Sequence, residues 1–328
     1  MQYNKVGHSD LKISEVGLGA MSLVQGQDDT NSYIINHARE LGINYLDTSD
    51  LYDKGKNEEL IGRLLSGERD KWILASKVGN KWREDGSGWD WKPSKDYILK
   101  AVEDSLRRLK TDYLDLYQLH GGTIDDPFDE IVEAFEILVK QGKIRYYGIS
   151  SIRPNVFLNY AEHSNIVSDM MQYSILDRRP EEYFPELAKR NISVLARGTV
   201  AQGLLIKKAA QKYLSYSVHD VLDIQKRINS IANDLNVSSL ALALKYPLLH
   251  EPVACCVLGI RTKTQVNALD NVFQEMSTLK IDSYSPLFNV LPKEIKYQDH
   301  RKKNQEFIFI ILRFKRGYPM RVTFFISC

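Results

Sequence analysis

Eight short apolar segments alternate with amphipathic helical patterns along most of the chain, and this alternation limits the possible folds more than any other feature. Strands that alternate with helices form parallel sheets, which are buried on both faces and therefore consist of continuous apolar runs. Eight such units in a chain of 328 residues favour a closed (β/α)8 barrel, the TIM barrel. The predicted strands cover residues 16–21, 42–46, 72–77, 114–120, 146–150, 167–172, 193–197 and 253–258.

The helical patterns between the strands have an apolar stripe and recognisable ends. Ser94 is expected to cap the start of one helix and Gly142 to follow the end of another. A doubly wound dinucleotide-binding sheet is disfavoured, because the segment Gly17-Leu-Gly19 lacks the third glycine of the Gly-x-Gly-x-x-Gly pattern. A turn-rich cluster within residues 2–13 predicts a small hairpin before the barrel. The predicted helices cover residues 30–41, 58–65, 94–109 and 129–141.

The charge and cysteine patterns exclude several function classes. The net charge is +2, and residues 302–328 contribute +5, so residues 1–301 carry −3 and lack the basic field of a nucleic-acid-binding protein. The three cysteines, Cys255, Cys256 and Cys328, suggest no disulfide framework and fit a reducing compartment. No run approaches the roughly 20 apolar residues of a membrane span, and the N-terminus lacks an apolar signal region. The sequence therefore predicts a cytoplasmic protein with no nucleic-acid or membrane partner.

Two stretches depart from the barrel pattern. Residues 79–93 contain three tryptophans among Gly, Asp and Arg, and they read as a long loop that either covers a site as a lid or is pinned to the barrel by its indole rings. Residues 302–328 mix apolar runs with Lys and Arg, without amphipathic periodicity. We therefore divide the chain into a barrel domain, 1–301, and a C-terminal extension, 302–328. The extension is either disordered or non-native, such as a frame-shifted end, or an element that docks on the barrel.

Three consecutive predicted strands end in ionisable residues, Asp47, Lys77 and His120. A buried strand has no structural need for such an end, but an active site at the C-terminal face of a barrel does. Reduction of a carbonyl requires a proton donor, and a tyrosine serves when a nearby ammonium stabilises its phenolate. Lys77 can supply that ammonium, Asp47 can keep it charged, and Tyr52 follows Asp47 closely in the chain. His120 can orient the carbonyl oxygen or take part in the proton transfer.

These residues stand in motifs that resemble the aldo-keto reductase family over nearly all of residues 3–301. The segment Asp47-Thr-Ser-Asp-Leu-Tyr52 resembles the family's Asp-Thr-x-x-x-Tyr signature, 105–120 resembles the segment that delivers its histidine, and 142–150 resembles its fifth strand. The resemblance implies a (β/α)8 barrel that uses NADP(H) to reduce aldehydes or ketones. It also implies a catalytic tetrad in which Tyr52 is the general acid, assisted by Asp47, Lys77 and His120.

The resemblance assigns nicotinamide-binding residues with two departures from the family pattern. Ser150 and Gln172 match the residues that bind the carboxamide, while Ser151 stands where the family usually has asparagine. Arg197 replaces an aromatic residue that often stacks on the nicotinamide, and a planar guanidinium can stack or bind a phosphate. The loop after it is expected to wrap the pyrophosphate through Gly198, Gln202, Gly203 and Leu204.

A third segment, 259–265, resembles the family's adenosine-phosphate site after the eighth strand. It implies cofactor contacts from Gly259, Arg261, Thr262 and Gln265. An arginine fork suits a 2′-phosphate better than a ribose hydroxyl, which favours NADP over NAD. Leu269 stands where the family has an asparagine for adenine, so recognition of the base is expected to differ.

Three alternatives to a carbonyl reductase remain at the level of sequence. Lys77 could form a Schiff base in a lyase, although this leaves Tyr52, Gln172 and Arg261 without a role. The chain could be a cofactor-binding regulatory or sensor subunit with incidental turnover, or an inactive, mis-terminated product. No metal site is expected, and the expected partner is a small-molecule carbonyl compound. The sequence specifies neither this substrate nor the oligomeric state.

Overall fold

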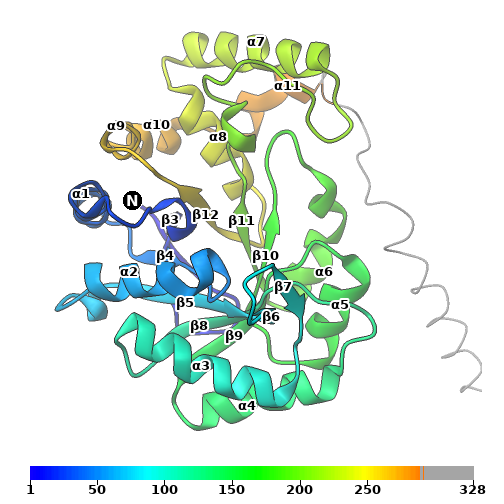
Figure 1. Cartoon of the computed structure of the whole chain (residues 1–328). Helices are drawn as coiled ribbons and strands as arrows, with labels where there is room; N and C mark the ends of the chain where they lie inside the picture. The colour runs from blue at the N-terminus through cyan, green and yellow to red at the C-terminus, as the bar shows by residue number, and fades with distance from the viewer. Residues whose placement is uncertain (289–290, 292–328) are drawn as a thin grey trace, which may run out of the picture.

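A closed barrel of eight parallel strands forms the centre of the molecule (Figure 1). The structure, a computed structural model, describes residues 1–288 and 291. The strands follow one another around the barrel in chain order, apart from two that belong to a separate hairpin. Their bounds are β3 Val16–Gly19, β4 Tyr45–Asp47, β5 Ile73–Val78, β8 Leu114–Leu119, β9 Ile144–Ile149, β10 Ser168–Gln172, β11 Ser193–Arg197 and β12 Val253–Gly259. The predicted (β/α)8 fold is confirmed.

Two apolar layers hold the barrel together. The inner layer fills the barrel and includes Tyr45, Leu116, Met170 and Leu195, one side chain from each of four strands. The larger outer layer lies between the strands and the surrounding helices. Successive strand residues point alternately to these two layers, and both faces are buried, so the strands are apolar throughout.

The helices cover the outside of the barrel and follow the predicted stripes. Ser94 caps α3 by accepting a hydrogen bond from the Tyr97 amide at 3.3 Å, and the chain turns at Gly142 with a φ of +71°, directly after α4. The helices α7 and α8 lie together beyond β11 and β12 (Figure 1). The helix bounds are α1 Asp28–Glu40, α2 Lys56–Leu64, α3 Lys95–Leu109, α4 Phe128–Lys140, α5 Pro154–His163, α6 Phe184–Lys189, α7 Val218–Leu235, α8 Ser239–Leu248, α9 Lys263–Asn267, α10 Val272–Thr278 and α11 Ser285–Phe288.

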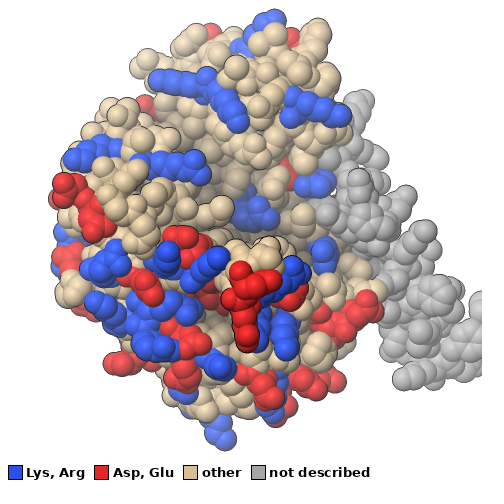
Figure 2. Space-filling view, in the orientation of Figure 1, with Lys and Arg blue, Asp and Glu red and all other residues tan. Residues whose placement is uncertain are grey.

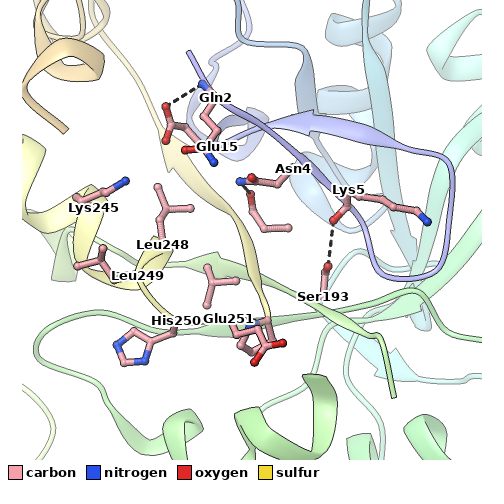
Figure 3. Close-up of a pocket in the computed structure, with 13 residues that line it drawn as sticks. Gln2, Asn4, Lys5, Glu15, Ser193, Lys245, Leu248, Leu249, His250 and Glu251 are labelled. Atoms are coloured by element: carbon pink, nitrogen blue, oxygen red, sulfur yellow. Dashed lines mark hydrogen bonds between the residues drawn. The ribbon is translucent and has the colours of Figure 1, made fainter. Parts of the chain in front are cut away.

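The predicted N-terminal hairpin is formed by β1 (Tyr3–Lys5) and β2 (Lys12–Ser14), which pair antiparallel. Its apolar residues Val6, Leu11 and Ile13 belong to the inner layer of the barrel, so the hairpin covers the end at which the strands begin. Figure 3 shows a polar cavity of about 210 Å³ beside it, lined by hairpin residues and by residues near the starts of β11 and β12. Residues at this end of such a barrel usually contribute to stability, and chemistry is expected at the opposite end.

Residues 79–93, expected to be a long loop, contain a second hairpin. The strands β6 (Asn80–Trp82) and β7 (Trp89–Trp91) pair antiparallel. The Trp82 indole donates to the Leu51 carbonyl at 3.1 Å, and the Trp91 indole donates to Asp126 at 2.7 Å. Trp89 is exposed. Two of the three tryptophans therefore attach the hairpin to neighbouring loops, as the pinned alternative anticipated.

The structure contains no helix, within residues 1–288, that has the length and hydropathy to cross a membrane. The predicted boundary at residue 301 and the extension 302–328 lie outside the described residues.

Candidate active site

Three neighbouring strands bring the ionisable residues predicted from sequence together at the C-terminal end of the barrel. Asp47 is the last residue of β4, Lys77 lies next to the end of β5, and His120 directly follows β8. The three strands are adjacent and parallel in the order β4, β5, β8. Tyr52 begins a 3-10 helix, η2 (Tyr52–Gly55), shortly after β4.

The Lys77 ammonium is the centre of this group. It donates to Asp47 Oδ2 at 2.5 Å, to the Thr48 carbonyl at 2.8 Å and to the Tyr52 hydroxyl oxygen at 3.2 Å. The Lys77 side chain is 1% exposed. An ammonium has three protons, and all three have an acceptor here.

Lys77 is charged in this environment. Burial alone would lower the pKa of the Lys77 ammonium, but the negative charge of Asp47, the Tyr52 oxygen and the hydrogen bonds to both raise it above its ordinary value. Burial raises the pKa of Asp47, and the charge and hydrogen bond of Lys77 oppose this rise by favouring the carboxylate. A charged ammonium with three acceptors has no free lone pair, which disfavours the Schiff-base alternative.

Gln118 supports Asp47 from the other side and was not singled out from the sequence. Its amide nitrogen donates to Asp47 Oδ1 at 3.2 Å, while Lys77 binds Oδ2. Gln118 lies two residues before His120, and strand residues two apart face the same side. This spacing was the signal available in the sequence.

His120 is neutral and tied to Ser49. Its Nδ1 atom lies 3.0 Å from Ser49 Oγ, and its ring packs edge-on against Tyr52 with centroids 5.9 Å apart. Burial, followed by the positive charges of Lys77 and Arg197, lowers the pKa of His120 to about 3. An uncharged imidazole held at Nδ1 keeps Nε2 for a ligand. Ser49 was also missed from sequence.

The candidate nicotinamide residues lie on the next strands around the barrel. Ser150 directly follows β9, and Gln172 and Arg197 end β10 and β11, which are paired at these two residues. The Gln172 amide nitrogen donates to the Tyr213 hydroxyl at 3.0 Å, and Arg197 reaches its amide oxygen at 3.5 Å. Tyr213 was not anticipated, since it comes from a distant loop.

Ser151, which stands in place of asparagine, is hydrogen-bonded to the Asp169 side chain and to the backbone of its own turn. Its amide donates to Asp169 at 3.0 Å, and its hydroxyl oxygen accepts from the Arg153 amide at 3.2 Å, just before α5. The expected contact between Ser151 and a cofactor would therefore have to come from the hydroxyl proton.

The loop after β11 is held in an unusual backbone conformation. Gly198 and Gly203 have positive φ angles, as does Gln202 with a φ of +57°. The Leu204 side chain is buried, and its carbonyl accepts from the Gln225 side chain at 2.7 Å, which ties the loop to α7. The Leu204 amide donates to the Ala201 carbonyl at 3.1 Å, so both backbone groups of this buried residue already have protein partners.

The candidate phosphate segment follows β12, which ends at Gly259. Thr262 caps the five-residue helix α9 by accepting from the Gln265 amide at 3.2 Å. The Gln265 side chain accepts from the Arg261 amide at 2.7 Å. The Arg261 side chain is exposed and forms no ion pair with any described residue. Leu269 is buried in the outer apolar layer, so it offers no polar atom for a base.

The shape and chemistry of this end of the barrel fit an anionic dinucleotide. Figure 2 shows a hollow in the middle of this view, over the region of β10 to β12, with Lys and Arg side chains inside it and at its edge. Thr199, in the loop after β11, has a buried hydroxyl without a hydrogen-bond partner among the described residues. Orphaned buried hydroxyls of this kind call for a partner from a ligand or water. The described residues contain no cluster of three or more His, Cys, Asp or Glu suited to a metal ion.

Comparison with known proteins gives consistent matches over most of the chain. The family model described as "Aldo/keto reductase family" matches residues 15–287. The chain is 52% identical over 268 residues to the uncharacterized oxidoreductase YqkF of Bacillus subtilis (strain 168), covering 79% of this chain and 87% of that protein. Aldo-keto reductase yakc (NADP(+)) of Schizosaccharomyces pombe is 27% identical over 270 residues, covering 74% and 78%. The holo structure of aldo-keto reductase AKR11C1 from Bacillus halodurans aligns with a TM-score of 0.85 at 47% identity, covering 92% of this chain and 99% of that one.

Proposed function

Since the chain belongs to the aldo/keto reductase family, we propose that it reduces aldehydes or ketones to alcohols with NADPH, and that Tyr52 is the proton donor. Membership of the family makes it an oxidoreductase that uses a nicotinamide cofactor. The observation that carries the finer proposal is the contact of one buried ammonium, Lys77, with both Asp47 and Tyr52.

Each residue of the site has a separate role in the proposed reaction. A bound nicotinamide supplies the hydride that reduces the carbonyl carbon. Tyr52 gives its phenolic proton to the carbonyl oxygen as negative charge develops there. Lys77, 3.2 Å away, stabilises the phenolate that remains, and Asp47 keeps Lys77 charged. His120 is available to hydrogen-bond the same carbonyl oxygen through Nε2.

The residues proposed to hold the cofactor are those around the hollow. Ser150 and Gln172, at the ends of β9 and β10, are proposed to bind the carboxamide, and Arg197 and the loop 198–204 to contact the nicotinamide and pyrophosphate. Arg261 is proposed to bind the 2′-phosphate, because its guanidinium is exposed and unpaired among described residues. Thr262 and Gln265 shape this segment by fixing its backbone.

The direct test is to follow NADPH absorbance with a panel of aldehydes and ketones, with NADH in parallel. The proposal expects turnover of at least one carbonyl compound and tighter binding of NADPH than of NADH. Binding of NADPH without turnover of any compound would instead support a regulatory subunit. Failure to bind either cofactor would overturn the proposal.

Arg261 gives the preference for NADPH its own test. Replacing Arg261 with alanine removes a charge-assisted pair worth roughly 1.5–3 kcal/mol, so NADPH affinity should fall about 10-fold or more while NADH affinity stays nearly constant. Lys263→Ala is the matched control, because it removes a neighbouring cation that lies over the Tyr33 ring at 5.0 Å. Equal losses for the two cofactors in Arg261→Ala would show that Arg261 does not read the 2′-phosphate.

A further inference from the structure

Ser49 connects His120 to a second buried carboxyl group, Asp50, that the proposed mechanism does not use. The Ser49 hydroxyl oxygen lies 3.0 Å from His120 Nδ1 and 3.2 Å from Asp50 Oδ1. It also accepts a hydrogen bond from the Leu51 amide at 3.1 Å. Asp50 and Leu51 lie in the loop after β4, and His120 directly follows β8.

The number of protons in this chain of contacts restricts its state. The Ser49 hydroxyl has one proton and two lone pairs, and the Leu51 amide occupies one lone pair. Ser49 can therefore donate to either His120 or Asp50 and must accept from the other. If Asp50 is ionised, Ser49 donates to it and His120 carries its proton on Nδ1. If Asp50 is protonated, it donates to Ser49, Ser49 donates to Nδ1, and the imidazole proton is on Nε2.

We propose that Asp50 is a positioning residue that acts through Ser49 to select the tautomer of His120. Only the tautomer with the proton on Nε2 can donate a hydrogen bond to a carbonyl oxygen in the site. The functional part of this inference rests on the proposed carbonyl reduction. The assignment of the His120 tautomer does not depend on that reaction.

The surroundings of Asp50 favour its protonated form. Glu58 of α2 is fully buried and binds Arg108 of α3 at 2.6 Å, so this arginine is already paired when it faces Asp50. The other groups near the carboxyl are hydroxyls, namely Tyr97 of α3 at 3.5 Å and Tyr117 of β8. Asp50 thus has no cation of its own among the described residues.

These contacts shift the titration of Asp50 upward. Burial, followed by the negative charge of Glu58, raises the pKa of Asp50 to about 8, against the opposing effects of Arg108 and the hydrogen bonds from Ser49 and Leu51. Below that pH the carboxyl can donate to Ser49, and above it the carboxylate can only accept. The His120 ring remains uncharged, with a single ring proton, across this range, since its pKa is lowered to about 3. The proposed switch therefore moves a proton between the two ring nitrogens without charging the ring.

Nuclear magnetic resonance of the full chain with 15N-labelled histidine tests the proposal without substrate. The 15N signals of His120 would be identified by their absence from the spectrum of His120→Gln. We expect its proton on Nε2 at pH 6.5 and on Nδ1 at pH 9.5. In Asp50→Asn the amide nitrogen can donate to Ser49 at every pH, so the Nε2 tautomer should persist at pH 9.5. The same tautomer at both values in the wild type, or an unchanged switch in Asp50→Asn, would overturn the proposal.

Two further variants separate this role from a structural one. Ser49→Ala breaks the connection while keeping Asp50, and the pH-dependent change of tautomer should disappear. Tyr97→Phe removes the hydroxyl that contacts Asp50 Oδ2 but leaves Ser49 in place, so the change should persist. If Asp50→Asn does not fold, the comparison of Ser49→Ala with Tyr97→Phe decides the question: a switch that survives in Ser49→Ala overturns the proposal.

The kinetic consequence follows only if the protein reduces carbonyls. The wild-type kcat should fall about tenfold between pH 7 and pH 9 through loss of one proton, and in Asp50→Asn this fall should shrink to about twofold. An identical alkaline fall in both proteins would overturn the link to catalysis. A tautomer switch in a protein that reduces no carbonyl would sink the proposed function while leaving the Asp50 assignment intact.

Discussion

Lys77 is proposed to stabilise the Tyr52 phenolate, and its buried ion pair with Asp47 also contributes to the stability of the fold. Its ammonium is buried with Asp47, and each charge compensates the cost of removing the other from water. Gln118 binds the second carboxylate oxygen, so Asp47 is fully engaged only when both partners are present.

Replacing Lys77 with methionine should therefore destabilise the protein by about 3–5 kcal/mol, because Asp47 is left as an uncompensated buried charge. Chemical denaturation followed by circular dichroism measures this loss. The double variant with Asp47→Asn, which removes the orphaned charge, should regain part of the stability. A Lys77→Met protein as stable as the wild type would show that the buried pair contributes nothing to the fold.

The sequence predicted those candidate site residues that lie at the ends of strands. Asp47, Lys77 and His120 were predictable because an ionisable group at the end of a buried apolar run has few structural explanations. Ser49, Asp50 and Tyr213 were not, because their contacts depend on how loops close over the barrel. A serine in a loop has no periodic pattern around it that would predict its contact with a histidine ring nitrogen.

The β6–β7 hairpin contacts the loop that carries Tyr52, the residue that we propose as the proton donor. The Trp82 indole binds the carbonyl of Leu51, which immediately precedes Tyr52. Lys54, also in this loop, lies over the Trp82 ring at 5.1 Å. The sequence predicted a long loop without its two strands, because three-residue strands among Gly and Asp are too short for an alternating pattern.

Trp82→Phe should lower kcat severalfold by releasing the Leu51 carbonyl and loosening the position of Tyr52, with a loss of stability of about 1 kcal/mol for one hydrogen bond. Trp89→Phe is the matched control on the same hairpin, because its ring is exposed and its indole has no hydrogen bond to a described residue. Steady-state kinetics compares the two. Equal effects would mean that the hairpin acts on the site in another way, or not at all.

For the whole molecule, the alternation of strands and helices determined the architecture because a closed barrel is the arrangement that buries eight parallel strands on both faces. The barrel is closed by β12, and the family match ends at residue 287. The sequence of residues 302–328 contains an apolar, uncharged run at 307–312 with the composition of an aggregation-prone segment. Within the described residues, each of the eight barrel strands has a neighbouring strand on both sides.

A protein truncated after Arg301 should accordingly keep the melting temperature and activity of the full chain, and it should aggregate less at high concentration. Differential scanning calorimetry and light scattering on the two proteins provide the comparison. A drop in melting temperature of about 5 °C or more, or a loss of activity, would show that the extension belongs to the fold.

In the proposed reaction Tyr52, whose phenolate Lys77 stabilises, protonates the carbonyl oxygen of the substrate. The most direct measurement compares the wild type with Tyr52→Phe for NADPH-dependent reduction of an aldehyde, together with NADPH binding by fluorescence titration. A lost general acid should lower kcat by about 10²–10⁴-fold, while the Kd for NADPH stays within about threefold, because the hydroxyl is assigned to the substrate. Turnover of Tyr52→Phe at the wild-type rate would contradict the account.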